Sequence, residues 1–132
     1  MRACIQRDRP GPYQIQAAIN AVHADADTLD ATDWTQIVTL YDQLMTLAPG
    51  PVVALNRAIA VAEVDGPAAG LSLIGQLDLD GYHPFHATRA DLLRRLGRNA
   101  EARVDYHRAA DGAPTAATRE LLVRQAARLH ID

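Results

Sequence analysis

The sequence lacks several features that would place the protein outside the cytoplasm or in a membrane. Its only cysteine is Cys4, so the chain cannot form an internal disulfide, and a reducing compartment is expected. No apolar run reaches the roughly 18 residues of a membrane span, and the start does not resemble a signal peptide. We therefore expect a cytoplasmic location and no membrane partner.

Lysine is also absent, because all 13 basic residues are arginines. The net charge of −3 argues against direct binding of nucleic acid by this chain. Residues 1–85 carry four arginines against ten acidic groups (−6), whereas residues 86–132 carry nine arginines against six acidic groups (+3). Genomic base composition is the simpler explanation of the arginine bias, and an acidic partner surface facing the basic half is the alternative.

Motifs of catalysis and cofactor binding are missing as well. The sequence contains no glycine-rich phosphate loop, no Gly-x-Ser-x-Gly elbow and no cysteine–histidine pair. Aromatic residues make up only 5% of the chain, so a core must be built from alanine and aliphatic side chains, which let helices approach closely. We expect no catalytic residues, no cofactor and no enzyme activity.

What the sequence does contain is a repeat. Residues 57–77 align without a gap on residues 89–109, an offset of 32, which pairs Arg57 with Arg89 and Ala58 with Ala90. The period is close to the roughly 34 residues of a tetratricopeptide helix pair. One such unit cannot bury its apolar face alone, so copies must stack on each other. The repeat favours a protein that binds rather than catalyses.

Turn signals divide the chain into seven predicted helices, at about residues 12–26, 34–48, 52–64, 67–77, 83–96, 99–111 and 115–129. Asp33 followed by Gln36 resembles a capping box before the second helix. The predicted fold is all-α: a tetratricopeptide-like, right-handed helical array of about three helix pairs plus a C-terminal capping helix. We assign it to residues 12–132, with residues 1–11 as the remnant of a linker. In the repeat register, the second helices align at Ile37, Gly70 and Ala102, then at Tyr41, Ile74 and Tyr106.

Six segments also form a long, ordered set of motifs. The set includes RPGPYQIQAAI (9–19), PVVALNRAIAVA (51–62) and HATRADLLRRLGR (86–98), with shorter matches at residues 33–37, 40–42 and 65–71. Together they resemble the C-terminal extension of one group of extracytoplasmic-function RNA polymerase sigma factors, in which a tetratricopeptide-like domain follows two sigma domains. No part of this sequence resembles those sigma domains. The resemblance implies a regulatory, protein-interaction domain whose partners are the sigma domains of the same full-length chain or RNA polymerase.

Two clusters invite a metal-site interpretation that the spacing does not support. His83 and His86 have an HxxH spacing, but a metal site needs further ligands that are not evident, so we interpret them as structural or exposed residues. Four aspartates, at positions 25, 27, 30 and 33, lack the glycine and glutamate of a calcium loop, and we interpret this segment as a helix-capping loop. We expect no metal site.

The predicted binding surface lies on the first helix of each pair, which lines the concave face of such arrays. The register of the last repeat directs polar residues to that face, with Asn20 and Thr88 nearby; the partner-binding candidates are His23, Asn56, Glu63, Asp91, Arg94 and Arg95. Arg57 and Arg89 have two interpretations, as interhelical ion pairs or as groove residues. Two alternative functions remain open: a free-standing peptide-binding scaffold, and a small-molecule or metal sensor built on His23, His83 and His86.

Overall fold

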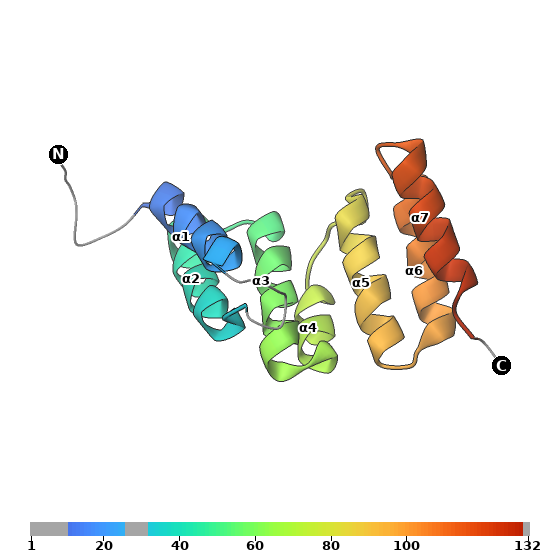
Figure 1. Cartoon of the computed structure of the whole chain (residues 1–132), viewed down its shortest axis with the longest axis horizontal. Helices are drawn as coiled ribbons and strands as arrows, with labels where there is room; N and C mark the ends of the chain where they lie inside the picture. Colours follow the sequence, from blue (N-terminus) through green and yellow to red (C-terminus); the bar gives the residue numbers. More distant parts are fainter. Residues whose placement is uncertain (1–10, 26–31, 131–132) are drawn as a thin grey trace.

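The computed structural model describes residues 11–25 and 32–130 of the 132-residue chain. These residues form helices and connecting turns, without a strand. The helices are α1 (Pro12–Asp25), α2 (Trp34–Leu47), α3 (Pro51–Asp65), α4 (Pro67–Ile74), α5 (His83–Arg95), α6 (Asn99–Asp111) and α7 (Ala116–Ala127). They stand in a row from α1 at one end to α7 at the other (Figure 1). The predicted all-α array of helix pairs is confirmed.

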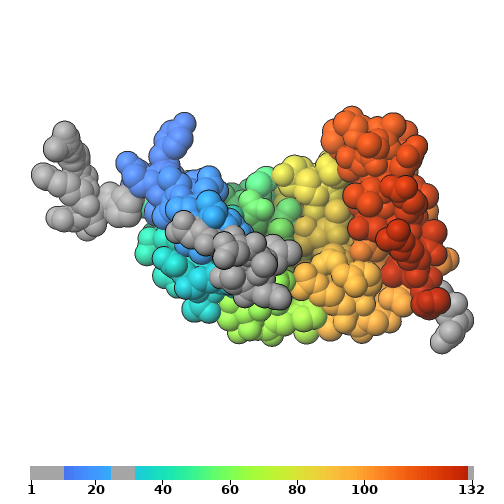
Figure 2. Space-filling model, viewed as in Figure 1, coloured from blue at the N-terminus to red at the C-terminus, as the bar shows by residue number. Residues whose placement is uncertain are grey.

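Each helix packs mainly on its neighbours in the chain. Contacts join every consecutive pair from α1 to α7, and α3 also touches α5, the first helix of the next pair. In the space-filling view the colours therefore follow one another along the molecule in sequence order (Figure 2). Contacts limited to nearest neighbours are typical of repeat arrays, in which stacking supplies the burial that one unit lacks.

The core consists of three clusters spaced along the array. The first joins α1, α2 and α3 around Ile19 and Ile37, and the second joins α3, α4 and α5 around Leu55 and Phe85. The third joins α5, α6 and α7, and consists largely of alanine with Tyr106 among them. Burial of aliphatic side chains at about 25 cal/mol per Å² is the main source of stability in such a core.

Local signals in the sequence set most of the helix ends. The Asp33 carboxylate accepts a hydrogen bond from the backbone N–H of Gln36 at 3.1 Å, which satisfies one free donor of α2, as predicted. Gly97 follows α5 with φ +78°, while Arg98 N–H donates to the Leu93 carbonyl at 2.9 Å. This left-handed glycine turn ends α5 and starts the return into α6.

The end of α4 differs from the prediction. The sequence predicts a helix to about residue 77, whereas α4 ends at Ile74. The backbone then closes in tighter turns, in which Gln76 N–H donates to Leu73 and Leu77 N–H donates to Ile74. Gly75 is a weak helix former, by about 1 kcal/mol relative to alanine, which favours termination here. As a result α4 has eight residues, whereas its counterpart α6 has 13.

A glycine sets the closest helix contact. A Cβ atom added to Gly70 would lie 2.6 Å from Ala62 Cβ and 3.0 Å from the Ala58 carbonyl oxygen. The backbones of α3 and α4 therefore meet at a distance that only glycine permits. Ala58 and its repeat counterpart Ala90 are both fully buried, which confirms the predicted small-residue positions.

Candidate functional site

A groove with a volume of about 240 Å³ lies between α3 and α5, the first helices of two successive pairs. We call it the α3–α5 groove. Its wall on α3 consists of Ile59 and Ala62. Its wall on α5 combines apolar and polar side chains: Ala87, Thr88, Asp91, Leu92 and Arg95. Residues three and four apart share one face of a helix, so positions 88, 91, 92 and 95 of α5 all point to this groove.

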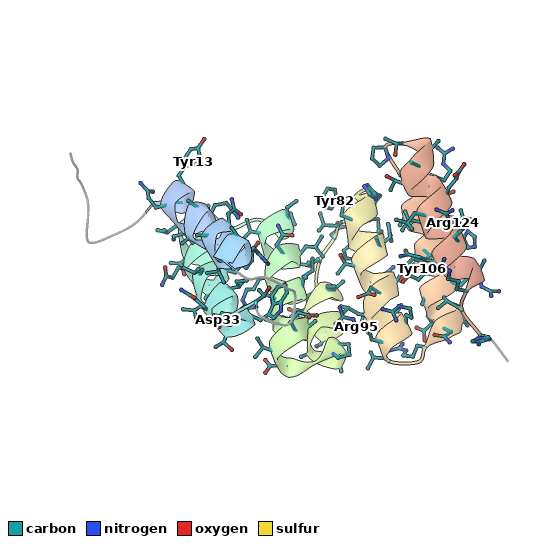
Figure 3. The ribbon with its side chains drawn as sticks, viewed as in Figure 1. Tyr13, Asp33, Tyr82, Arg95, Tyr106 and Arg124 are labelled. Atoms are coloured by element: carbon teal, nitrogen blue, oxygen red, sulfur yellow. The ribbon has the colours of Figure 1, made fainter. Side chains whose placement is uncertain are left out.

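An ion-pair network crosses the rim of the α3–α5 groove. Arg95 Nη1 lies 2.8 Å from Glu63 Oε2 on α3, and Arg95 Nη2 lies 2.9 Å from Asp91 Oδ2 on α5. Arg94 Nη2 donates to the other oxygen of Asp91 at 2.6 Å. Figure 3 shows Arg95 between α5 and the preceding helix pair. These side chains are about one-third to one-half exposed, so a partner can reach them.

The same contacts hold both arginines in the charged form. Burial opposes the charge of Arg95, but its hydrogen bond to Glu63 and the nearby Asp91 together outweigh burial and raise the pKa of Arg95. The hydrogen bond to Asp91 raises the pKa of Arg94, and a bond to Tyr106 of α6 adds to it. The groove rim therefore carries fixed charges of both signs.

The structure brings together three of the predicted partner-binding residues, Glu63, Asp91 and Arg95. Arg94 contacts Asp91 but also turns towards Tyr106, and it does not line the groove. The groove also contains the apolar residues Ile59 and Ala62 of α3, which sequence reasoning missed. Their signal was their spacing of three positions, which places both on one face of the helix.

The remaining two candidates lie elsewhere. Asn56 is half-buried in α3 and is not among the lining residues of the groove. His23 lies on α1, where its ring meets Trp34 edge-on at 5.3 Å between centroids. Because α3 stands between α1 and α5, the structure does not combine His23 with the histidines of α5 (Figure 1). In residues 11–25 and 32–130, no group of three or more metal-ligating side chains is arranged for a metal ion.

Arg57 and Arg89 both form interhelical ion pairs, as the first interpretation of these residues predicted, and Arg89 also lines a second groove described below. Arg57 reaches back to Asp42 of α2. Arg89 instead reaches forward to Asp105 of α6, with Nε and Nη2 at 2.7 and 2.8 Å from the two carboxylate oxygens. This bidentate hydrogen bond is the main cause of the raised pKa of Arg89.

Asp105 is the centre of a buried polar cluster that the sequence did not reveal. Its side chain is 5% exposed, and His86 Nδ1 and Arg108 Nη1 each lie 3.6 Å from its Oδ1. His86 is also buried, and its Nε2 lies 2.7 Å from the carbonyl oxygen of Asp80. The Arg89 guanidinium covers the Phe85 ring at 4.9 Å. The only signal in the sequence was that the repeat aligns Asp105 with the apolar Leu73.

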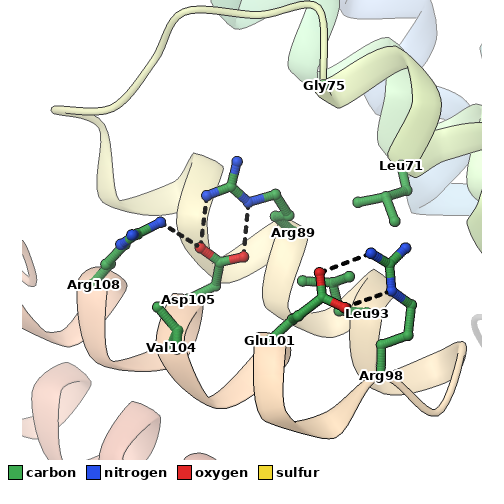
Figure 4. Close-up of a pocket in the computed structure, with 9 residues that line it drawn as sticks. All are labelled: Leu71, Gly75, Arg89, Leu93, Arg98, Glu101, Val104, Asp105 and Arg108. Atoms are coloured by element: carbon green, nitrogen blue, oxygen red, sulfur yellow. Dashed lines mark hydrogen bonds and ion pairs between the residues drawn. The ribbon is translucent and has the colours of Figure 1, made fainter.

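A second groove lies between the second helices of successive pairs, the α4–α6 groove (Figure 4). Its volume is about 430 Å³. Its lining combines apolar residues with charges of both signs: Leu71, Gly75, Arg89, Leu93, Arg98, Glu101, Val104, Asp105 and Arg108. It lies on another face of α5, since positions 89 and 93 are turned away from positions 88, 91 and 95 by about a third of a helical turn.

Comparison with known proteins gives one sequence relative. The chain is 52% identical over 103 residues to an uncharacterised protein of Rhizobium meliloti (strain 1021), an alignment that covers 76% of this chain. The chain spans about a quarter of that relative, 24% of its length. No family model matches the sequence.

Among solved structures, the chain is similar to the first TPR domain of Spaghetti (RPAP3), solved bound to the HSP90 peptide SRMEEVD. The TM-score is 0.69 at 18% sequence identity, and the match covers 92% of this chain and 94% of that one. The fold is therefore that of a tetratricopeptide-like array. None of the helices in the described residues is long and apolar enough to cross a bilayer.

Proposed function

We propose that this domain is the C-terminal regulatory domain of an alternative RNA polymerase sigma factor, in the cytoplasm, and that it acts by protein–protein contact without catalysis. Six motifs spread from residue 9 to residue 98 resemble this class of domain. The relative from Rhizobium meliloti, of which the chain covers 24%, has room for further domains. Its partners are the sigma domains of the same full-length chain, or RNA polymerase.

The observation that carries a binding role is the α3–α5 groove with its charged rim. The groove offers an apolar floor at Ala62 and Leu92 and exposed charges at Asp91 and Arg95, and Arg95 pairs with Glu63 beside the groove. Exposed ion pairs contribute only about 0–1 kcal/mol, so a partner's charged groups can replace them at small cost. A segment that places an apolar side chain on the floor and polar groups on the rim fits this groove.

Tethering favours contact within one chain. A domain linked to its target is present at an effective concentration of about millimolar, so even weak groove contacts become occupied. Release of that contact by a signal then changes how the sigma domains meet polymerase. This is the form of regulation that we infer for the full-length factor.

The test is a charge reversal in the full-length factor. Arg95→Glu places a third carboxylate beside Glu63 and Asp91. Like charges brought together in a contact cost over about 1 kcal/mol, so we expect promoter output in a reporter assay to change by about tenfold. The matched control is Arg119→Glu, an exposed arginine on α7. A thermal melt of this chain must show that Arg95→Glu stays folded.

Equal reporter output for wild type, Arg95→Glu and the control would remove the α3–α5 groove from the mechanism. A free-standing peptide-binding scaffold is the second candidate, because the similar TPR domain of Spaghetti binds a peptide. Calorimetry with the separately produced sigma domains distinguishes the two candidates. Binding that Arg95→Glu weakens supports the sigma-factor role, and absence of binding favours the free scaffold.

A further inference from the structure

The α4–α6 groove lies between two second helices that differ in length, and it reaches Gly75 at the end of α4. In the repeat alignment Ile74 corresponds to Tyr106, but α4 stops at Ile74 whereas α6 continues to Asp111. Arg108 therefore lies beyond the aligned end of α4, whereas the other lining residues near α6, from Arg98 to Asp105, align with residues 66–73. Figure 4 shows the open space between Gly75 at the end of α4 and Asp105 on α6.

The dimensions of this groove suit a peptide segment better than a single small anion. Its charged residues on the α6 side extend from Arg98 to Arg108, ten positions apart. At 1.5 Å per residue the two arginines are separated by about 15 Å along the helix. That length corresponds to nearly three turns of a partner helix, and Val104, which is 50% exposed, lies between the two charges.

The charges of the groove favour an acidic partner. Its lining has three arginines and two carboxylates, an excess of one positive charge. Arg89 and the buried Asp105 form a fixed pair, and Figure 4 shows the third nitrogen of Arg89 pointing away from Asp105. Arg108 is 56% exposed and its contact with Asp105 is 3.6 Å long, so its guanidinium is available to a partner carboxylate.

Arg98 is the second available cation. It pairs with Glu101 through two bonds of 2.7 and 2.8 Å, but both side chains are at least half exposed. Water screens such a pair, so a partner carboxylate can take the place of Glu101 with little loss. The excess of positive charge in residues 86–132 adds a longer-range attraction for an acidic surface.

We propose that the α4–α6 groove is a second docking surface, distinct from the α3–α5 groove, and that its occupant is an acidic amphipathic segment of a partner protein. Apolar side chains of that segment pack on Leu71, Leu93 and Val104, while flanking carboxylates pair with Arg98 and Arg108. The domain then has two docking surfaces on different faces of α5, and one can be lost without the other.

The probe for the test is a fluorescein-labelled synthetic helix of about three turns, with leucines on one face and glutamates on both sides of them. A second probe carries lysines in place of the glutamates. Fluorescence anisotropy at about 0.15 M salt, where surface charges more than about 8 Å apart are screened, should show binding of the glutamate probe and much weaker binding of the lysine probe. Arg98→Glu combined with Arg108→Glu should weaken binding by at least about tenfold, or 1.4 kcal/mol.

A matched double variant, Arg119→Glu with Arg124→Glu, changes the net charge equally but alters exposed arginines of α7 outside the groove. It should retain the affinity of the wild-type chain, as should Arg95→Glu in the α3–α5 groove. Val104→Ser should weaken binding several-fold, because it removes apolar contact without a change of charge. Thermal melts identify any variant that fails to fold, and Val104→Ser then decides the outcome, since Val104 is half exposed.

Three results would overturn this proposal. One is no binding of the glutamate probe up to millimolar concentration. Another is an equal loss of affinity in the groove variant and the α7 variant, which would reduce the interaction to net charge. The third is displacement of the probe by inorganic phosphate at low millimolar concentration, which would identify a small-anion site instead.

Discussion

Two successive repeat units, α3–α4 and α5–α6, occupy equivalent positions in the alignment but join their two helices differently. In α3–α4 the helices meet at Gly70, whose missing side chain lets Ala58 and Ala62 approach. In α5–α6 the equivalent residue is Ala102, and a buried ion pair between Arg89 and Asp105 links the helices. The shared pattern of small and apolar residues thus sets the stacking, while single residues decide what holds each pair together.

Arg57 and Arg89, which occupy equivalent positions in the two units, show this difference most clearly. Position 73 is leucine where α6 has Asp105, so Arg57 has no acid at the equivalent position and pairs with Asp42 of the preceding unit. Asp42 is 53% exposed and Asp105 is 5% exposed. One arginine therefore ties successive units together at the surface, and the other holds its own unit together in the interior.

The comparison of the two units predicts its largest difference in the free energy of unfolding between variants of Asp105 and Asp42. Asp105→Ala should destabilise the chain by about 3 kcal/mol, because it leaves the charged Arg89, whose side chain is only 23% exposed, without its partner. Asp42→Ala should cost about 0–1 kcal/mol, as expected for an exposed pair. Urea denaturation of both variants measures the difference. Similar losses in the two variants would show that burial does not separate the two units.

A second prediction tests what the two units share. Ala58→Leu and Ala90→Leu should each cost about 1–3 kcal/mol, because both residues are fully buried at equivalent positions of successive repeat units. Ala100→Leu, at an exposed position of α6, is the control and should change the free energy of unfolding by less than about 0.5 kcal/mol. Urea denaturation compares all three. A neutral result at either buried alanine would disprove the repeat register for that unit.

A third, smaller effect is expected at the contact that belongs to α3–α4 alone. Gly70→Ala should destabilise by about 1 kcal/mol, since the strain of an added methyl group exceeds the gain in helix propensity. Gly75→Ala is the matched control, because its added Cβ would have only ordinary contacts of 3.6 Å. The control should be neutral or slightly stabilising. Thermal denaturation of the two variants measures the contrast, and a stabilised Gly70→Ala chain would contradict the close approach.

The sequence predicted the fold well because the helices of an array depend on local signals. Proline and glycine marked most helix ends, and Asp33 capped α2 as expected. The one clear error was the end of α4, where Gly75 competes with an apolar pattern that continues to Leu77. The periodicity of apolar residues shows which residues face the core, but it does not show at which residue a helix ends.

The candidate site was predictable only in part. The register of the first helices placed Glu63, Asp91 and Arg95 on one face, and the structure joins these three side chains by ion pairs. It could not reveal the buried Asp105, because an isolated acid on a helix normally faces water and its partner lies 16 residues away. The α4–α6 groove was equally hidden, because the repeat alignment does not show how far apart the second helices of successive units stand.

The smallest predicted effect adds the first helix pair to the comparison. Tyr41 occupies the position of Ile74 and Tyr106 in the later units, and it is 9% exposed. Burial raises the pKa of Tyr41 above its ordinary value of 10.0, although a hydrogen bond with Gln16 lowers it in part. The folded state therefore favours the neutral phenol. This contribution to stability is fully present below about pH 10, the pKa in the unfolded chain, and is lost as the pH rises through the higher pKa of the folded state.

Above about pH 10, the free energy of unfolding should fall less steeply with pH in Tyr41→Phe than in the wild-type chain. The difference in slope is at most that of one proton, roughly 1.4 kcal/mol per pH unit. At neutral pH the same change should cost only about 0.5 kcal/mol, the low end for a lost hydrogen bond, because Gln16 is exposed to water. Tyr13→Phe is the control, since that side chain is 91% exposed. Urea denaturation between pH 7 and pH 11 gives both slopes. If Tyr41→Phe and the control keep the wild-type slope, the phenol of α2 is hydrated in the folded state, and the first unit is packed more loosely at this position than the unit that contains Ile74.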